Sequence, residues 1–204
     1  MATPLTTPPA SRRERTHQAL VAGARRVFER DGFLDARIAD IAAESGVATG
    51  SFYTHFDDKK AAFAAVIAEV TEETLHPQLE VVPSRDDPVA VIEAAHREYL
   101  RAYRRNAKLM ALLDQVALID EDFRRVRLER AHAFAQRNAK AIRRLQAQGL
   151  ADATLEPLPT AHALNAMVSR MASLVYVHGE KIPFEALLAT LTQLWANALR
   201  LPVR

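Results

Sequence analysis

The chain of 204 residues contains no cysteine. This excludes disulfide bonds, thiol catalysis and zinc sites built on thiolates. Glycine is also scarce, with 6 residues in all, which leaves little material for the glycine-rich phosphate loop of a nucleotide-binding enzyme. No apolar run approaches the roughly 20 residues that a membrane-spanning helix needs. The first eleven residues have no apolar centre, so we expect neither a membrane anchor nor a signal peptide.

What the chain does contain is enough apolar material for a folded core. Hydrophobic residues make up 49% of the sequence, which argues against global disorder. The formal net charge is only +2. A charge this small does not by itself indicate binding to nucleic acid, so any such function must be argued from where the charges lie.

Apolar residues recur at helical spacing along nearly the whole chain, and no segment has the alternation typical of a strand. The sequence therefore predicts an all-α fold of about nine helices. Residues 1–11 are rich in Thr and Pro and are expected to form a disordered arm. We expect residues 12–57 to form a small N-terminal domain and residues 58–204 to form a larger helical one. A linker at 83–88 ends in Asp87-Pro88, which favours the start of a helix.

One stretch, residues 37–56, predicts two short helices joined by a tight turn. Ile41 lies on an apolar face of the first helix, and Gly46 follows where a helix end favours a residue of positive φ. Phe52 and Phe56 lie four residues apart on one face of the second helix, whose remaining positions carry hydroxyl groups and an imidazole. A short, braced helix with a polar outer face is typical of a DNA-reading helix-turn-helix.

The pattern from Ala24 to Val66 resembles the DNA-binding domain of the TetR family of transcriptional regulators. The positions that carry the resemblance are Ala24, Phe28, Gly32, Phe33, Ile41, Ala42, Gly46, Val47, Gly50, Phe52, Tyr53, His55, Phe56, Lys59 and Phe63. The resemblance implies a homodimer with a ligand-binding C-terminal domain, in which a small molecule relieves repression. Ala48 departs from the family pattern, because a Ser often caps the second helix there; a lost cap costs about 1 kcal/mol.

The candidate DNA-binding residues lie in and around this second helix: Arg37, Thr49, Gly50, Ser51, Tyr53, Thr54, His55 and Lys59. We expect Tyr53 and His55 to bind phosphate oxygens, although Tyr53 packing between helices is an alternative. Thr49 and Thr54 are candidates to contact base edges, unless Thr49 is a plain helix cap. Gly50 has no side chain and would let the backbone approach DNA closely.

Other cations at the edge of this stretch are candidates for the DNA backbone. Lys59 stands at a helix start, where its charge and the helix dipole would favour a phosphate; a solvated surface lysine is the alternative. Arg37 is a candidate for a phosphate. Arg12, Arg13 and Arg15 lie just after the N-terminal arm and either reach DNA or form a basic leader.

The C-terminal part offers a weaker signal for a ligand site. Its candidate residues are Tyr99, Tyr103, Met110, Leu113, Met167, Arg170, Met171 and Tyr176, which combine aromatic, methionine and a few polar side chains. Ordinary core packing is the alternative for each of them. Arg170 lies within an apolar segment and favours an anionic or acyl ligand.

The last two predicted helices, 160–178 and 184–201, are apolar over more than one face and predict a four-helix interface between two copies of the chain. Its candidate contact residues are Phe184, Leu188, Leu191 and Trp195. Packing of Trp195 in the core of its own chain is the alternative. The histidines of the C-terminal part do not cluster with carboxylates at ligand spacing, so we expect no metal site.

Taken together, these patterns predict a cytoplasmic, ligand-responsive repressor that binds a palindromic operator in double-stranded DNA as a homodimer. A small hydrophobic or acyl-type effector would release it. We expect no cofactor and no membrane contact. The alternatives are a helical interaction module and an all-α enzyme without a role on DNA; the enzyme is disfavoured because no recognisable catalytic motif is present.

Overall fold

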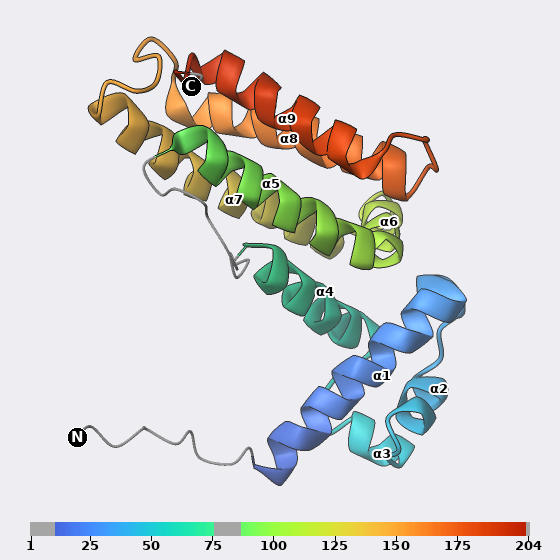
Figure 1. Ribbon diagram of the computed structural model, residues 1–204. Helices are drawn as coiled ribbons and strands as arrows, with labels where there is room; N and C mark the ends of the chain where they lie inside the picture. Colours follow the sequence, from blue (N-terminus) through green and yellow to red (C-terminus); the bar gives the residue numbers. More distant parts are fainter. Residues whose placement is uncertain (1–10, 76–86, 203–204) are drawn as a thin grey trace, which may run out of the picture. The chain divides into compact units, whose positions relative to one another are not determined.

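The computed structural model describes residues 11–75 and 87–202, and within these ranges the chain forms nine α-helices and no strand (Figure 1). The helices are α1 (Arg12–Asp35), α2 (Ile38–Glu44), α3 (Thr49–Phe52), α4 (Lys59–Leu75), α5 (Pro88–Arg105), α6 (Ala107–Val116), α7 (Glu121–Ala147), α8 (Pro157–Tyr176) and α9 (Phe184–Leu199). The predicted all-α fold is confirmed. No helix in the described ranges combines the length and the apolar character needed to cross a bilayer.

The chain divides into two compact units, Met1–Ala68 and Glu69–Arg204. The division falls inside α4, so the first turns of this helix belong to one unit and its last turns to the other. The sequence placed the boundary earlier, before residue 58. The later position has a physical reason, because Phe63 of α4 packs against Phe28 and Phe33 with ring centroids 4.9 and 5.2 Å apart. The predicted arm, up to residue 10, and most of the linker lie outside the described residues.

The core of the first unit is built on α1. Its buried face consists of Leu20, Val21, Gly23, Ala24, Val27, Phe28 and Phe33. Ser11 caps the helix, since its Oγ accepts a hydrogen bond from the Glu14 backbone N–H at 3.1 Å. Gly32 has a left-handed φ of 78°, and a further short turn extends α1 beyond it to Asp35.

Two glycines allow α1, α2 and α3 to come together. Gly46 in the turn between α2 and α3 has a φ of 68°, which favours glycine over any residue with a Cβ. Gly23 serves a different purpose, because a Cβ built there would lie 2.1 Å from the Ser45 Oγ. The absent side chain thus lets the C-terminal end of α2 approach α1. The role of Gly46 was predicted from the sequence, whereas the role of Gly23 was not.

The second unit contains α5 to α9, with α7 packed along α8 and α5 packed along α9. Asp87 caps α5 as predicted, accepting hydrogen bonds from the backbone N–H groups of Val89 and Ala90 at 2.9 and 3.3 Å. The largest fully buried side chains of this unit are Leu100, Leu109, Ile142, Leu187, Leu188 and Leu191.

Helix α6 ends at Val116, and Leu118 and Ile119, which follow it, are 78% and 72% exposed. Their apolar character therefore did not mean that they are buried. Helix α8 begins at Pro157, which is tolerated in the first turn because the N–H it lacks would have no intrahelical partner.

Candidate nucleic-acid interface

Helix α3 has only four residues, Thr49–Phe52, and is too short to be stable alone. Ala48 is its N-cap and provides no side-chain hydrogen bond, as the sequence predicted. Two phenylalanines hold it instead: Phe52 is 0% exposed, Phe56 is 6% exposed, and their ring centroids lie 5.5 Å apart. The chain after α3 turns back with Phe56 N–H donating to the Phe52 carbonyl at 2.9 Å. Packing rather than capping therefore stabilises this element.

The outer side of α3 and the turn after it carries the predicted polar residues. Thr49, Gly50, Tyr53 and Thr54 are exposed. Tyr53 is 57% exposed, so it does not pack between helices as the alternative proposed. Thr49 occupies the first helical position and makes no cap. The Thr54 hydroxyl donates to the Ser51 carbonyl at 2.7 Å, which leaves its oxygen free to accept and its methyl group free to contact an apolar surface.

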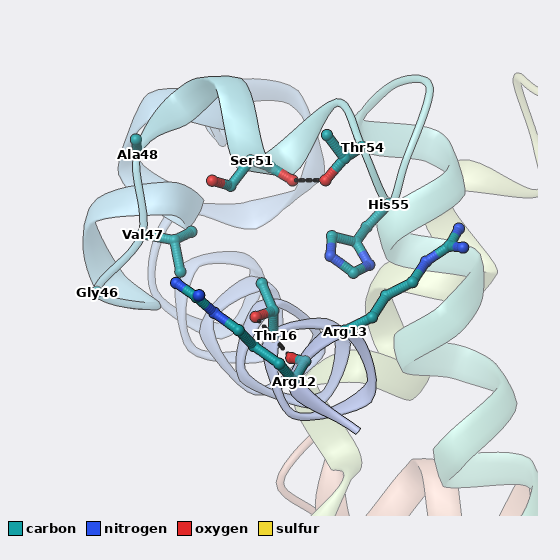
Figure 2. Close-up of a pocket in the computed structure, with 9 residues that line it drawn as sticks. All are labelled: Arg12, Arg13, Thr16, Gly46, Val47, Ala48, Ser51, Thr54 and His55. Atoms are coloured by element: carbon teal, nitrogen blue, oxygen red, sulfur yellow. Dashed lines mark hydrogen bonds between the residues drawn. The ribbon is translucent and has the colours of Figure 1, made fainter. Parts of the chain in front are cut away.

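An open hollow of about 600 Å³ lies between the start of α1 and the helix-turn-helix (Figure 2). It is lined by Arg12, Arg13, Thr16, Gly46, Val47, Ala48, Ser51, Thr54 and His55. Arg12 extends toward Val47 in this view. The hollow brings the predicted basic residues of α1 to the same surface as Ser51, Thr54 and His55, although they lie some forty positions apart in the sequence. Cations and hydroxyl groups around a concave surface are suited to a phosphate group.

His55 sits half-buried at the edge of this hollow. Burial lowers its pKa, and the charges of His17 and Arg13 lower it further. The His17 ring is 5.7 Å from that of His55 and 5.0 Å from that of Phe56. A neutral imidazole still has one N–H group to donate to a phosphate oxygen. His17 was not singled out from the sequence, because nothing local connects it to a residue almost forty positions away.

Lys59 takes part in the fold of the first unit. Its Nζ donates to the carbonyls of Leu34 and Ala36 at 2.7 and 3.2 Å and lies 5.1 Å from the Phe33 ring centroid. It therefore ties the start of α4 to the connection between α1 and α2. This contact differs from both predicted roles, the phosphate ligand and the solvated lysine. Arg37, in contrast, is exposed just before α2.

The predicted ligand-binding residues other than Arg170 are buried or half-buried. Tyr103, Met110 and Leu113 are buried, whereas Tyr99, Met167, Met171 and Tyr176 are half-buried. The ring of Tyr103 lies 6.0 Å from that of Tyr99 and 6.4 Å from that of Tyr176, so three of these residues form one tyrosine cluster. Burial raises the pKa of Tyr103 to about 12.

The prediction that Arg170 binds a ligand inside the second unit is wrong, because Arg170 is exposed and does not face the interior. The buried face of α8 contains Ala161, Leu164, Val168 and Ala172. Arg170 lies two residues from Val168 and from Ala172, which corresponds to about 200° around a helix and puts it on the opposite side. Two half-buried arginines of this unit, Arg130 and Arg137, were not singled out from the sequence. Their spacing of four and three residues from Phe134 was the available signal.

Three of the predicted interface residues are buried in the core of their own chain. Leu188, Leu191 and Trp195 are 1%, 1% and 6% exposed within the single chain. Trp195 packs edge-on against His96 of α5 at 5.2 Å between ring centroids, so the core alternative describes it. Helix α9 is apolar on more than one side chiefly because it packs along α5. Phe184 remains half-buried.

Comparison with known proteins supports a single family. The family model of bacterial regulatory proteins, tetR family, matches residues 20–66. A putative TetR-family transcriptional regulator from Rhodococcus sp. superposes with a TM-score of 0.77 at 20% identity, covering 91% of this chain and 98% of that one. Salmonella enterica GusR superposes with a TM-score of 0.74 at 19% identity, covering 96% of this chain and 98% of that one. A comparison with curated sequences gives no match.

A third solved structure, a putative TetR-family transcriptional regulator from Syntrophomonas wolfei, has a TM-score of 0.76 at 18% identity and covers 92% of this chain and 97% of that one. Identities this low carry the fold and not the ligand. The family model, in turn, covers the residues of the helix-turn-helix. The two findings agree with the exposed polar surface around α3: residues 20–66 match the model of the tetR family of bacterial regulatory proteins, and the fold of the whole chain is that of the solved TetR-family regulators.

Proposed function

We propose that this regulator is a repressor that binds a palindromic operator as a homodimer and leaves it when an effector binds the second unit. The observation that carries the proposal is the surface around α3. Its exposed hydroxyl-bearing residues adjoin a hollow lined by Arg12 and Arg13. The expected cytoplasmic location follows from this role.

The side chains of this surface divide by chemistry into two groups. Arg12, Arg13, Tyr53 and His55 offer charge or an N–H or O–H donor to phosphate oxygens, which fixes orientation but reads no sequence. Thr49, Thr54 and Gly50 are the candidates to approach base edges. Short threonine side chains make few base contacts, so specificity would depend also on DNA shape and on the spacing of two half-sites.

Gly50 supports close approach to DNA. A Cβ built at Gly50 would meet no atom of the chain within 4 Å, and its backbone is not in the left-handed region. Nothing within the folded chain therefore requires glycine at this position. A duplex lying against α3 would supply the missing steric reason.

The dimer would form through the outer face of α9 instead of the residues first predicted. Six exposed residues follow helical spacing on that face: Ala186, Ala189, Thr190, Gln193, Leu194 and Asn197. Small side chains allow a second helix to come close, and Leu194, 44% exposed, provides an apolar contact at the centre of the face. A two-fold axis through this face would pair each residue with the partner's copy of the same patch.

The effector would act through the second unit, where the tyrosine cluster of Tyr99, Tyr103 and Tyr176 lies. Helix α4 is a continuous element that belongs to both units, so a ligand that prefers one position of its last turn would bias the DNA-binding unit. Differential affinity for the two states is sufficient for release of the operator.

A binding experiment tests the proposal. Full-length protein is titrated against labelled DNA from upstream of its own coding sequence, at two salt concentrations, with a scrambled fragment of equal length as control. We expect tight binding to the natural fragment only, weakening with salt, and a footprint with two-fold symmetry. Equal affinity for both fragments at moderate salt would refute the operator function.

A further inference from the structure

The second unit contains two arginines arranged around one buried ring. Phe134 of α7 is 7% exposed. The guanidinium carbons of Arg130 and Arg137 lie 5.1 and 5.4 Å from its ring centroid. Tyr99 of α5 meets the same ring edge-on at 5.8 Å. We refer to Arg130, Phe134 and Arg137 as the arginine–phenylalanine cluster. It joins the tyrosine cluster through Tyr99.

The two guanidinium groups donate few hydrogen bonds. Arg130 Nη2 donates to Thr74 Oγ1 at 3.4 Å, while its Nε is buried without a hydrogen bond. Arg137 Nη1 donates to the Leu75 carbonyl, and its Nε lies 3.5 Å from Asn138 Oδ1. Within the described ranges neither arginine has an ion pair with a carboxylate. Burial lowers the pKa of Arg137, as expected for a cation without a counter-ion.

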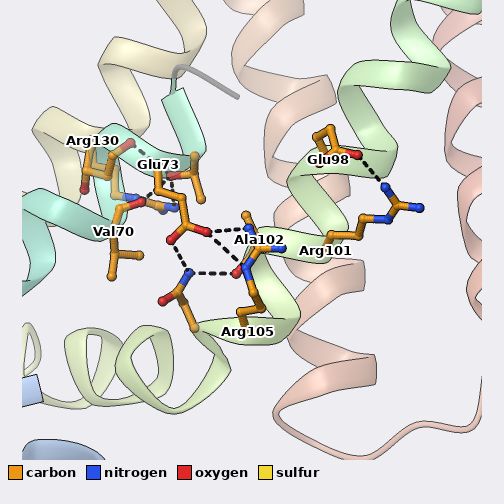
Figure 3. Close-up of polar contacts among 10 residues, drawn as sticks. Val70, Glu73, Glu98, Arg101, Ala102, Arg105 and Arg130 are labelled. Carbon is orange, nitrogen blue, oxygen red and sulfur yellow. Dashed lines mark hydrogen bonds and ion pairs between the residues drawn. The ribbon is translucent and has the colours of Figure 1, made fainter. Parts of the chain in front are cut away.

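The carboxylate next to this cluster is already engaged. Glu73 precedes Thr74 on α4, and Figure 3 shows it bonded to Arg105. Its second oxygen accepts from Asn106 Nδ2 at 3.1 Å. Glu73 thus has its own cation and amide partners on α5 and at the α5–α6 junction. Among residues 11–75 and 87–202, no carboxylate forms an ion pair with Arg130 or Arg137.

Arg130 and Arg137 are half-buried, and a partly buried cation without a counter-ion carries a desolvation cost that a bound anion offsets. The planar guanidinium group matches a carboxylate, which can accept two parallel N–H bonds. Tyr99 contacts the ring between the two cations, and the rings of Tyr103 and Tyr176 continue from it at 6.0 and 6.4 Å. The Tyr176 hydroxyl is buried without a hydrogen-bond partner. The available atoms are therefore donors beside an apolar, aromatic wall. This combination suits a molecule that has a carboxylate at one end and an apolar body.

We propose that the arginine–phenylalanine cluster is the head-group site of the effector, and that the effector is an organic carboxylate whose apolar body lies against Tyr99, Tyr103 and Tyr176. This inference rests on the proposed function, which requires an effector in the second unit. It replaces Arg170 by Arg130 and Arg137 as the residues that bind the anion. Both guanidinium groups contact the last turn of α4, so the bound carboxylate would also bear on that helix.

Direct calorimetric titration without DNA tests the inference. The probes are two carboxylates with different bodies, decanoate and 1-naphthoate, and their neutral isosteres, decanamide and 1-naphthamide. We expect at least one carboxylate to bind full-length protein with a dissociation constant below about 1 mM and at least tenfold more tightly than its amide. Failure of both carboxylates to bind, or equal affinity for acid and amide, would overturn the inference.

Variants locate the site. Arg130→Gln and Arg137→Gln should each weaken carboxylate binding at least tenfold, whereas Arg143→Gln, an exposed arginine on the same helix, should leave it unchanged. If the arginines were only structural, both variants would lower the melting temperature of the ligand-free protein; we expect it to change little, because both guanidinium groups are only half-buried and the Arg130 Nε has no hydrogen-bond partner to lose. Unchanged carboxylate affinity in both glutamine variants would overturn the inference.

The same variants separate this inference from the proposed function. Arg130→Gln and Arg137→Gln should bind operator DNA as the parent protein does and should no longer release it on addition of the carboxylate. If the parent protein binds carboxylate but no specific DNA, the proposed repressor fails while the head-group site stands. If it binds the operator and no carboxylate, the head-group site fails while the repressor stands.

Discussion

Replacing Gly50 by alanine separates what the fold requires from what DNA binding requires. The added Cβ would point into open space, with no atom of the chain within 4 Å. The backbone of Gly50 is also compatible with an L-residue, because its φ is not left-handed. We therefore expect Gly50→Ala to fold at least as stably as the parent protein and to bind its operator less tightly.

The magnitudes follow from helix propensity and from packing. Alanine in place of glycine inside a helix stabilises it by up to about 1 kcal/mol, and α3 is short, so the gain in the free energy of unfolding should be a fraction of that. A methyl group forced into a close-packed contact costs about 1–3 kcal/mol. If DNA lies against α3 at this position, the dissociation constant should rise by roughly 5- to 150-fold.

Urea unfolding followed by circular dichroism gives the free energy of unfolding. Fluorescence anisotropy with labelled operator gives the dissociation constant. Gly23→Ala is the matched control, because its Cβ would lie 2.1 Å from Ser45 Oγ and 3.1 Å from the Ile41 carbonyl oxygen. It should lower the free energy of unfolding by about 1–3 kcal/mol despite the better helix propensity of alanine. Operator binding by Gly50→Ala that equals the parent's would refute the reasoning that DNA fills the space over Gly50.

Three further predictions concern the dimer, the phosphate contacts and pH. Leu194→Asp should convert the dimer to monomers in sedimentation velocity, whereas Leu128→Asp, 61% exposed on α7, should not; equal behaviour would exclude the α9 face. Arg12→Gln and Arg13→Gln should each reduce the slope of log affinity against log salt by about 0.9, and an unchanged slope would remove that arginine from the DNA backbone. Burial lowers the pKa of His96 to about 4 in the folded protein, whereas the same histidine in the unfolded chain has a pKa near 6.5. The unfolded chain therefore binds a proton first as the pH drops. The free energy of unfolding should fall by up to about 3 kcal/mol between pH 6.5 and pH 4. A His96→Gln variant should lose this part of the decline in urea unfolding at pH 7, 6 and 5, and an identical decline in both proteins would contradict the assignment.

The features predicted correctly from the sequence are those set by neighbours along the chain. Gly46 in the turn and Asp87 before α5 act within a few residues of their own positions, so residue type and spacing identify them. The uncapped start of α3 at Ala48 is of the same kind. Phe52 and Phe56 were assigned to the braced side of α3 by their spacing, and both are buried. The all-α fold follows because helical periodicity is a local property repeated along the whole chain.

The errors concern faces whose burial depends on a distant segment. The pattern of α9 indicated an apolar stripe but not its neighbour, and Trp195 was assigned to a partner subunit although α5 of the same chain covers it. Arg170 was expected inside because its sequence neighbours are apolar, yet it lies on the opposite side of α8 from Val168.

The sequence by itself determined the all-α fold, the Asp87 cap of α5, the uncapped start of α3 and the polar outer side of the helix-turn-helix, because these arise from contacts within one or two turns. Only the tertiary structure decided that Arg12 and Arg13 share a hollow with His55, and that Arg130 and Arg137 surround Phe134 near the end of α4. Such sites join residues separated by many turns of helix, and local periodicity contains no information about which helices pack together.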